Sequence, residues 1–424
     1  MSQAAATVRG VETRGIYWGV PTYPDSLKGL KAIVFGANGI SGNYMVRALS
    51  RAPERWEQVV ALSRRPPLAN QNIARNVRHV QADLLQDPKD IARILKDERV
   101  QADVVFFFAY LQPTPKEGAS LWSNAEELCK VNGQLLQNCL DALELASIRP
   151  KRFLLQTGAK YYGGGLAVPA LESDPRIAEP NFYYVQEDLL AEYSRSTGVQ
   201  WNVVRPAFII GAVEDAAMNS VYPLAVYAAV QKHKGEKLIW PGNFAAWERE
   251  VVQSSAWLNS YLSEFVTLNE QAGNQAFNAA DASYFTYGGL WVELAAWYGI
   301  EYTLPDVGTE GFQELSLEFK KNMSFAPTPI LKFKFSFVEW AQRPENKQAW
   351  KELVDKHGLK GNPFGDNLQR IFEFLDFAML PPFPFTLSMT KARKLGWNGS
   401  VDPVLSHREV IEEFVAMKMV PPLT

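Results

Sequence analysis

Short apolar runs recur along the chain, and each is bounded by glycine, proline or polar residues. Runs this brief indicate strands buried on both faces of a parallel sheet. The strands that we expect cover residues 32–35, 59–62, 77–81, 104–108, 152–156, 201–206, 238–240 and 276–279. Apolar residues at helical spacing alternate with these runs, most clearly in residues 43–50, 125–145 and 403–417. This alternation predicts an α/β fold with a doubly wound parallel sheet.

The turn after the first expected strand is rich in glycine. Gly36, Gly39 and Gly42 follow residues 32–35 at three-residue spacing, with Asn38 and Ile40 between them. In a strand–turn–helix unit these glycines allow a sharp turn, a close approach of backbone to pyrophosphate, and tight packing of helix on strand. The second strand, at residues 59–62, completes the βαβ unit of a Rossmann sheet.

The end of the second strand carries the sequence Ser63-Arg64-Arg65 where a site for NAD usually has an acidic residue. Two guanidiniums and a hydroxyl suit a 2′-phosphate, so we expect NADPH as the cofactor. The alternative is a pair of solvated arginines on a loop. Farther along, Asp83 and Leu84 end the third strand, where the aspartate either meets adenine or caps the next helix.

The composition changes character toward the C-terminus. From residue 284 onward phenylalanine, tryptophan and proline are frequent, which predicts a smaller, mainly helical substrate domain. Its phenylalanines either fill a core or form a hydrophobic lid over an apolar substrate. We expect an N-terminal arm over residues 1–30, packed through Tyr17, Trp18 and Tyr23. The expected NADP-binding domain covers 31–207 and 238–283, and the expected substrate-binding domain covers 208–237 and 284–424.

Charge and length argue against several classes of function. The chain has 424 residues, 47% of them hydrophobic, and a net charge of −3 without basic runs, so neither nucleic acid nor anionic lipid is an expected partner. We see no signal peptide and no run of membrane-spanning length, and we expect a cytoplasmic protein. Cys129 and Cys139 lie on different faces of one predicted helix and should not pair. The four histidines are isolated, so no metal site is predicted.

The residues suited to reductase chemistry come from two segments. None of the sixteen tyrosines is followed by lysine four residues later, the usual dyad of a Rossmann reductase. Lys160 instead follows the fifth strand, and Tyr183 and Tyr184 begin a later helix. Both segments should meet at the carboxyl edge of the sheet, beside the nicotinamide position expected near Ala109 and Tyr110. By spacing alone, ordinary packing of these side chains is an equal alternative.

Several motifs resemble those of the progesterone 5β-reductase and iridoid synthase family, atypical extended short-chain dehydrogenase/reductases. The resemblance spans about residues 31–279 and is loose after residue 284. It rests on the glycine turn, Ser63-Arg64-Arg65 and Arg205-Pro206, and on residues 157–162, 181–188, 218–219, 226–233 and 241–247. It implies NADPH-dependent 1,4-reduction of an alkene conjugated to a carbonyl, in a bulky apolar substrate such as a terpenoid, steroid or polyketide.

The resemblance also implies site residues. Tyr183 and Lys160 match the catalytic tyrosine and lysine. The expected cofactor-binding residues are Gly36, Asn38, Gly39, Ile40, Gly42, Ser63, Arg64, Arg65, Asp83, Leu84, Ala109, Tyr110, Thr157, Gly158, Lys160, Pro206, Ala207 and Ile209. The expected substrate-binding residues are Tyr110, Tyr161, Tyr184, Phe208, Met218, Asn219 and Tyr222.

The chain departs from the family pattern close to the expected substrate. Tyr161 stands where histidine is usual, Ala207 and Phe208 replace Gly-Asn, and residues 253–255 lack the usual acidic side chains. The cofactor is therefore a firmer expectation than the substrate. A carbonyl reductase, epimerase or dehydratase on the same sheet is the alternative enzyme, and an NADP-binding protein without catalysis is the alternative outside enzymology. A homodimer is compatible with the sequence.

Overall fold

The computed structural model describes residues 8–67, 74–113, 123–163, 168–215, 218–308, 310–316, 330–365 and 367–424. Seven strands form one parallel sheet in the order β12-β8-β7-β6-β3-β4-β5. The strands are β3 (Leu30–Phe35), β4 (Trp56–Ser63), β5 (Val77–Gln81), β6 (Val104–Phe107), β7 (Arg152–Gln156), β8 (Gln200–Pro206) and β12 (Gln275–Ala279). Because strand order reverses beside β3, a crevice for a ligand opens there at the carboxyl edge. The predicted doubly wound α/β sheet is confirmed.

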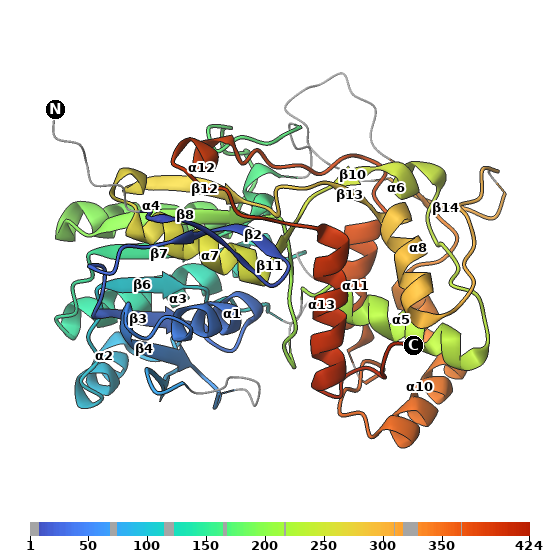
Figure 1. Cartoon of the computed structure of the whole chain (residues 1–424), viewed down its shortest axis with the longest axis horizontal. Coiled ribbons are helices and arrows are strands. Elements are labelled where there is room, and N and C mark those ends of the chain that lie inside the picture. The colour runs from blue at the N-terminus through green and yellow to red at the C-terminus, as the bar shows by residue number, and fades with distance from the viewer. Residues whose placement is uncertain are drawn as a thin grey trace.

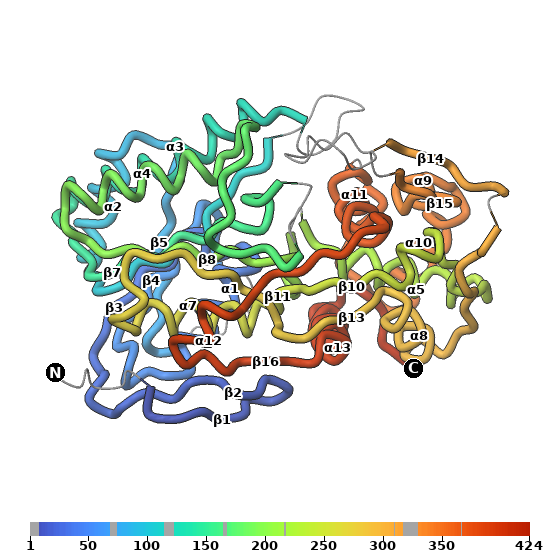
Figure 2. The backbone as a smooth tube through the Cα atoms, turned by 90° about the horizontal axis from the view of Figure 1, so that it is seen from above, coloured from blue at the N-terminus to red at the C-terminus, as the bar shows by residue number. Residues whose placement is uncertain are grey.

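Alternation along each strand explains why the runs are apolar throughout. Ile33 and Phe35 of β3 pack into one hydrophobic cluster, whereas Ala32 and Val34 pack into another on the opposite face. Helices cover both faces, so neither set of side chains meets water. Figure 2 shows α2, α3 and α4 on one side of the sheet and α1 and α7 on the other. These helices are α1 (Ile40–Ser50), α2 (Pro88–Asp97), α3 (Ala125–Leu145), α4 (Phe182–Thr197) and α7 (Ala256–Leu268).

The N-terminal arm forms a hairpin that pairs with a strand from near the other end of the chain. β1 (Gly10–Arg14) pairs with β2 (Tyr17–Thr22), and β2 pairs with β16 (Ser400–Val401), all antiparallel. Tyr17 and Tyr23 are buried and Trp18 is exposed. Packing of the arm through the two tyrosines is therefore confirmed, and packing through Trp18 is wrong, since its side chain faces solvent.

A third hydrophobic cluster, which we call the helical body, lies beyond the carboxyl edge of the sheet, on the right in Figure 1. It is mainly helical, as predicted. Its helices are α5 (Val221–Lys234), α6 (Phe244–Glu248), α8 (Tyr287–Tyr298), α9 (Phe337–Gln342), α10 (Pro344–His357), α11 (Leu368–Met379) and α13 (Pro403–Ala416). The remaining elements are β9 (Phe208–Ile210), β10 (Glu250–Val251), β11 (Gln253–Ser255), β13 (Phe285–Thr286), β14 (Gln313–Ser316), β15 (Ile330–Phe333), α12 (Thr390–Lys394), and the short 3₁₀ helices η1 (Ala159–Tyr162) and η2 (Glu270–Ala272).

One predicted strand is wrong. Leu238 forms only an isolated bridge with Tyr302, and residues 238–240 do not join the central sheet. Leu238 and Trp240 are instead buried in the helical body. The predicted domain boundaries stay a prediction. The helical body and the clusters on the sheet divide the chain at other positions than those boundaries. Trp240 and Trp247 pack with the helical body, while Trp397 returns to the cluster against the sheet.

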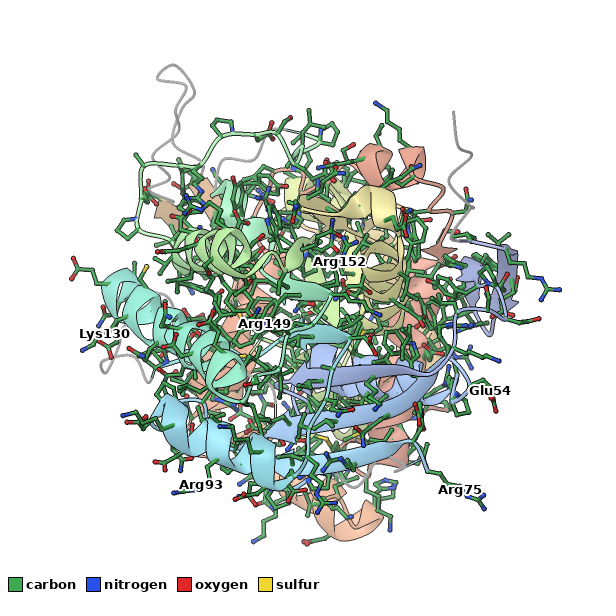
Figure 3. The ribbon with its side chains drawn as sticks, turned by 90° about the vertical axis from the view of Figure 1, so that its left-hand side faces the viewer. Glu54, Arg75, Arg93, Lys130, Arg149 and Arg152 are labelled. Carbon is green, nitrogen blue, oxygen red and sulfur yellow. The ribbon has the colours of Figure 1, made fainter. Side chains whose placement is uncertain are left out.

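The outer surfaces of the sheet domain are polar. In Figure 3 the labelled Glu54, Arg93 and Lys130 stand at the rim of the molecule and point away from the ribbon. Over the described ranges, every helix is too short or too polar to cross a membrane. Cys129 and Cys139 are both free thiols, as predicted.

Candidate active site

The glycine turn has the geometry that its spacing predicts. Gly36 has φ of +78°, and a Cβ there would lie 2.7 Å from the Ala109 nitrogen, so a side chain would collide with the end of β6. A Cβ on Gly42 would lie 2.2 Å from the Gly36 oxygen, because α1 starts directly against the turn. Gly39 differs from both. Its nearest atom is the Gly36 oxygen at 3.5 Å, so its outer side is open for a ligand to reach the backbone.

Asn38 and Ser63 shape the loop after β4 from inside the protein. Asn38 Nδ2 donates to the carbonyl oxygens of Arg65 and Pro66, at 3.2 and 2.7 Å. Ser63 Oγ donates to the Arg65 carbonyl at 2.7 Å and lies 2.7 Å from His79 Nε2. Both side chains are buried. These bonds hold the loop in place and engage the Ser63 hydroxyl internally, while contact of Ser63 with a phosphate stays a prediction.

The two arginines of this loop differ in their surroundings. Arg64 is exposed and makes no ion pair with any residue that the structure describes. Arg65 Nη1 lies 2.9 Å from Asp215 Oδ2, and the same carboxylate also pairs with Arg370 of α11. Although desolvation opposes it, the attraction of these guanidiniums holds the pKa of Asp215 below its ordinary value. Arg64 is thus the side chain more readily available to a ligand.

Asp83 does not cap a helix. Its Oδ1 accepts from the Leu85 N–H at 3.0 Å, and α2 begins later, capped by Asp87. The helix-cap alternative is wrong, while contact of Asp83 with adenine stays a prediction. Leu84 is buried in the cluster between the sheet and helices α2 to α4.

The ends of three neighbouring strands supply the rest of the expected cofactor surface. Ala109 and Tyr110 follow β6, Thr157 and Gly158 follow β7, and Pro206 ends β8. Since β6, β7 and β8 are adjacent and parallel, these residues share one edge. The Thr157 hydroxyl is buried without a hydrogen-bond partner among the described residues. Of the other expected contacts, Ala207, Ile209 and Ile40 are partly buried against the sheet-side cluster.

Lys160 and Tyr183 are brought to this edge from different elements. Tyr183 begins α4, and its hydroxyl lies 2.8 Å from where a Cβ of Gly158 would be. Lys160 lies in η1, two residues after Gly158, with its Nζ 5.9 Å from the centroid of the Phe182 ring. The Phe182 and Tyr183 rings are 4.3 Å apart. The predicted meeting of the amine and phenol segments is therefore present in the fold, while their catalytic roles stay predictions.

Lys160 is exposed at this edge. Desolvation by the surrounding protein nevertheless lowers the pKa of its amine to about 8, against a smaller opposing effect of Cys129. A cation with a lowered pKa beside the expected cofactor residues is a candidate for a role in binding or catalysis.

Burial raises the pKa of Tyr183 above its ordinary value. A raised pKa keeps the phenol protonated at neutral pH. In that form it can donate a hydrogen bond to an oxygen that becomes negative.

Tyr161 and Tyr184 point into the interior. Tyr184 Oη accepts from the Ile177 N–H at 3.0 Å and donates to the Tyr161 carbonyl at 2.5 Å. The Tyr161 ring stacks against the Arg205 guanidinium, 3.4 Å from the ring centroid. Arg205 in turn pairs with Glu187 of α4 at 3.0 Å. The expected contact of Tyr161 and Tyr184 with a substrate is therefore not supported, because both side chains are buried among these partners.

Phe208 belongs to a group of aromatic residues that lies between the helical body and the cluster on the α1 and α7 face of the sheet. Its ring stacks on Phe385 at 4.6 Å and meets Phe374 and Phe377 of α11 edge-on at 5.8 and 5.9 Å. We call these four residues the aromatic seam. Phe377 is 42% exposed. Since Phe208 lies two residues beyond Pro206, the aromatic seam is close to the strand ends that carry the expected cofactor residues.

The remaining expected substrate contacts lie on or before α5. Asn219 Oδ1 accepts from the N–H groups of Val221 and Tyr222, both at 3.1 Å, so it caps that helix. The Tyr222 ring packs against Phe414 at 5.3 Å and its hydroxyl is buried. Asn219 and Tyr222 are thus buried at the start of α5, and Met218 is partly buried. The contact of these three residues with a substrate stays a prediction.

Sequence reasoning missed Gln156 at the sheet edge, and it placed Asn181 only at the start of a helix. Gln156 Nε2 donates to Ser41 Oγ at 2.9 Å, and its Oε1 accepts from Asn259 at 2.7 Å, which ties β7 to α1 and α7. Asn181 is the N-cap of α4, a position that its place before an apolar–aromatic helix start signals.

The open side of Gly39 and the buried Thr157 hydroxyl test whether a dinucleotide fits this edge. The first leaves room for a pyrophosphate against the N-terminus of α1, and the second offers a hydroxyl that has no partner within the described ranges. Arg64 adds a positive charge at the end where the ribose of the adenosine would lie. The residues present therefore fit a nicotinamide dinucleotide.

Comparison with solved structures shows the fold. UDP-glucose 4-epimerase from Thermotoga maritima superposes with a TM-score of 0.56 at 16% identity, and the match covers 91% of this chain and 99% of that one. The enzyme of the same name from Thermus thermophilus, solved in complex with NAD, gives a TM-score of 0.55 at 16% identity over the same shares. At this identity the likeness concerns the fold alone.

Comparison with curated proteins is more specific. A 3-oxo-Δ4,5-steroid 5β-reductase of Arabidopsis thaliana is 30% identical over 401 residues, covering 92% of this chain and 93% of that protein. An (S)-8-oxocitronellyl enol synthase of Camptotheca acuminata is 30% identical over 408 residues, with the same coverage. A short-chain dehydrogenase of Penicillium aethiopicum is 29% identical over 92% of this chain and 99% of its own length.

The family model described as a PRISE-like Rossmann-fold domain matches residues 32–325, which include the glycine turn, Lys160, Tyr183 and the aromatic residue Phe208. The motifs that resemble this family in the sequence therefore lie within the matched region. The chain belongs to the PRISE-like family of Rossmann-fold proteins, that of progesterone 5β-reductase and iridoid synthase.

Proposed function

We propose that this protein is an NADPH-dependent reductase of an activated carbon–carbon double bond, conjugated to a carbonyl in a bulky apolar molecule. The observation that carries the proposal is the approach of Tyr183 and Lys160 to one edge of the sheet, from segments far apart in sequence. NADPH, when bound, supplies a hydride to the β-carbon of the alkene, and a proton then completes the saturated carbonyl compound.

Tyr183 is the proposed donor to the substrate oxygen. As the double bond is reduced, negative charge accumulates on that oxygen as an enolate, and a preorganised phenol stabilises it. One such donor is worth on the order of 3 kcal/mol, or about 100-fold in rate. Because burial raises the pKa of Tyr183, the proton stays on the phenol and is available for this hydrogen bond.

Lys160 is proposed to bind the cofactor ribose and to place positive charge beside the reacting oxygen. With its pKa lowered to about 8, the amine is still mostly protonated at neutral pH.

The substrate side of the site is proposed to be the aromatic seam, which exposes part of Phe377 and offers no charged group of its own. Such a surface favours a large apolar molecule over a sugar nucleotide.

Replacement of Tyr183 by phenylalanine tests the catalytic role. We expect kcat to fall about 100-fold with cyclic enones and 2-enals, while the dissociation constant of NADPH stays within about twofold. Tyr193→Phe, on the same helix but buried against the opposite cluster, is the matched control. Undiminished turnover by Tyr183→Phe would contradict the proposal, as would an absence of turnover by the wild-type protein with every enone despite NADPH binding. Product analysis separates the saturated carbonyl compound from an alcohol or an epimer.

Arg64 and Arg65 test the proposed preference for NADPH. Loss of the Arg64 guanidinium should weaken binding of NADPH by ~1.5–3 kcal/mol and leave binding of NADH nearly unchanged. Arg65→Ala should cost less, because Arg65 is already paired with Asp215 and must exchange that partner for a phosphate. Titration of both cofactors by fluorescence gives the four constants. Equal losses for NADPH and NADH in Arg64→Ala would mean that Arg64 does not bind the 2′-phosphate.

A further inference from the structure

One side chain, that of Asn181, binds the backbone of both Lys160 and Tyr183. Asn181 Oδ1 accepts from the Tyr183 N–H at 3.0 Å, and its Nδ2 donates to the Lys160 carbonyl at 2.9 Å. The side chain is buried, with 5% of its surface exposed. One amide group therefore binds the backbone of both residues that the proposed mechanism requires.

The second of these bonds is more than helix capping needs. A helix N-cap requires only an acceptor for the first free N–H groups, which serine or aspartate provides equally well. Asn243, the N-cap of α6, shows the ordinary case, since its Oδ1 accepts from the Ala246 N–H at 2.9 Å. In Asn181 the amide nitrogen adds a bond to η1, the short 3₁₀ helix that carries Lys160. A short 3₁₀ helix has few internal bonds, so an external one has a large effect on its position.

We propose that Asn181 is a positioning residue, which sets Lys160 relative to Tyr183 at the cofactor edge. The inference rests on the proposed function for its effect on turnover, but not for its effect on cofactor binding. Asn181 acts through the backbone of its neighbours and does not itself meet the substrate. The Tyr184 hydroxyl also ties α4 to η1, at the Tyr161 carbonyl, but the Nδ2 bond of Asn181 acts at Lys160 itself. Without that bond the Lys160 backbone loses its own contact with the start of α4, and a shift near 1 Å at a catalytic group can cost up to about 100-fold in rate.

Asn181→Ser separates the two bonds. Serine keeps the cap on the Tyr183 N–H and lacks a group that can reach the Lys160 carbonyl. We expect kcat to fall at least about 10-fold and NADPH to bind about 3- to 10-fold more weakly, with a melting temperature close to that of the wild type. Asn243→Ser is the matched control, because it replaces a capping asparagine in the helical body, and it should leave both constants unchanged.

A double-mutant cycle decides whether Asn181 acts through Lys160. If it does, Asn181→Ser should weaken NADPH binding little further in a Lys160→Ala background. Additive losses would overturn the proposal, as would wild-type kcat and NADPH binding in Asn181→Ser. If Asn181→Ser does not fold, Asn181→Asp serves in the same cycle, since it keeps the cap and replaces the Nδ2 donor with an acceptor. The NADPH arm needs no substrate, so it tests this inference even if the protein reduces no enone.

Discussion

At the scale of single residues, the site depends on how closely a phenol approaches a glycine. Gly158 has an extended backbone that any residue adopts, so its lack of a side chain is explained by space and not by conformation. The atom that a Cβ would meet is the Tyr183 hydroxyl, the far end of a side chain that is able to turn away. A methyl group at Gly158 would therefore move the phenol and leave the backbone where it is.

Gly158→Ala should consequently reduce activity with little effect on folding. We expect kcat with an enone to fall about 10-fold or more, because the displaced hydroxyl no longer meets the substrate oxygen. The free energy of unfolding should change by less than about 1 kcal/mol. Steady-state kinetics and urea unfolding give the two values. A variant that loses stability and keeps its kcat would show that Gly158 serves packing alone.

Lys160 should make cofactor binding dependent on pH. The amine carries its charge below its pKa and loses it above, so affinity for the anionic cofactor should fall as the pH rises through about 8. The measurement is the NADPH dissociation constant between about pH 6 and 10. In Lys160→Gln this decline should be absent, and an identical decline in that variant would assign the titration to another group.

At the scale of elements, the turn from β3 to α1 contains two glycines with different functions. A Cβ on Gly42 would lie 2.8 Å from Ala37 Cα and 2.2 Å from the Gly36 oxygen, and both are backbone atoms that cannot move aside. A Cβ on Gly39 meets only ordinary contact, and its φ of −75° suits alanine. Gly42 therefore serves the packing of the helix on the turn, and Gly39 serves the open ligand surface.

This difference predicts opposite outcomes for two identical substitutions. Gly42→Ala should lower the free energy of unfolding by about 1–3 kcal/mol or more, because the overpacked helix must shift. Gly39→Ala should leave stability nearly unchanged and weaken NADPH about 10-fold, since its methyl group occupies the approach of the pyrophosphate. Urea unfolding and cofactor titration of both variants provide the comparison. If Gly39→Ala bound NADPH normally, the pyrophosphate would not lie against this turn.

At the scale of the whole molecule, the aromatic seam lies between the cluster on the sheet and the helical body. Phe208 comes from the chain just after β8, while Phe374 and Phe377 come from α11, so the contact joins residues more than a hundred and fifty positions apart. A substrate bound at the sheet edge would meet α11 across this contact. The distant part of the sequence would thus contribute to the proposed site, whose expected cofactor contacts all lie between Gly36 and Ile209.

Phe377→Ala tests that arrangement. We expect KM for bulky apolar enones to rise about 5- to 30-fold, the equivalent of about 1–2 kcal/mol of lost apolar contact, with an unchanged dissociation constant for NADPH. Stability should change little because Phe377 is partly exposed. Phe244→Ala is the control, as it removes an exposed phenylalanine of α6 outside the aromatic seam. Equal effects of the two variants on KM would exclude the aromatic seam as the substrate surface.

The two candidate catalytic residues came from the resemblance to a family, while the sequence by itself determined the sheet and the glycine turn. Local patterns are sufficient there, because a buried parallel strand must be apolar throughout and a nucleotide turn must contain glycine. The strand expected at residues 238–240 failed for a related reason. Three apolar residues are buried equally well in a helical body, and nothing local distinguishes that packing from a sheet.

Only the tertiary structure decided which polar groups remain available and which are engaged. It pairs Arg65 with Asp215 and leaves Arg64 exposed, and it turns Tyr161 and Tyr184 inward while Tyr183 meets Gly158. It also places the Asn181 amide between two segments twenty residues apart. The physical reason is that side-chain direction, desolvation and hydrogen-bond partners depend on atoms brought from elsewhere in the chain, which no local pattern encodes.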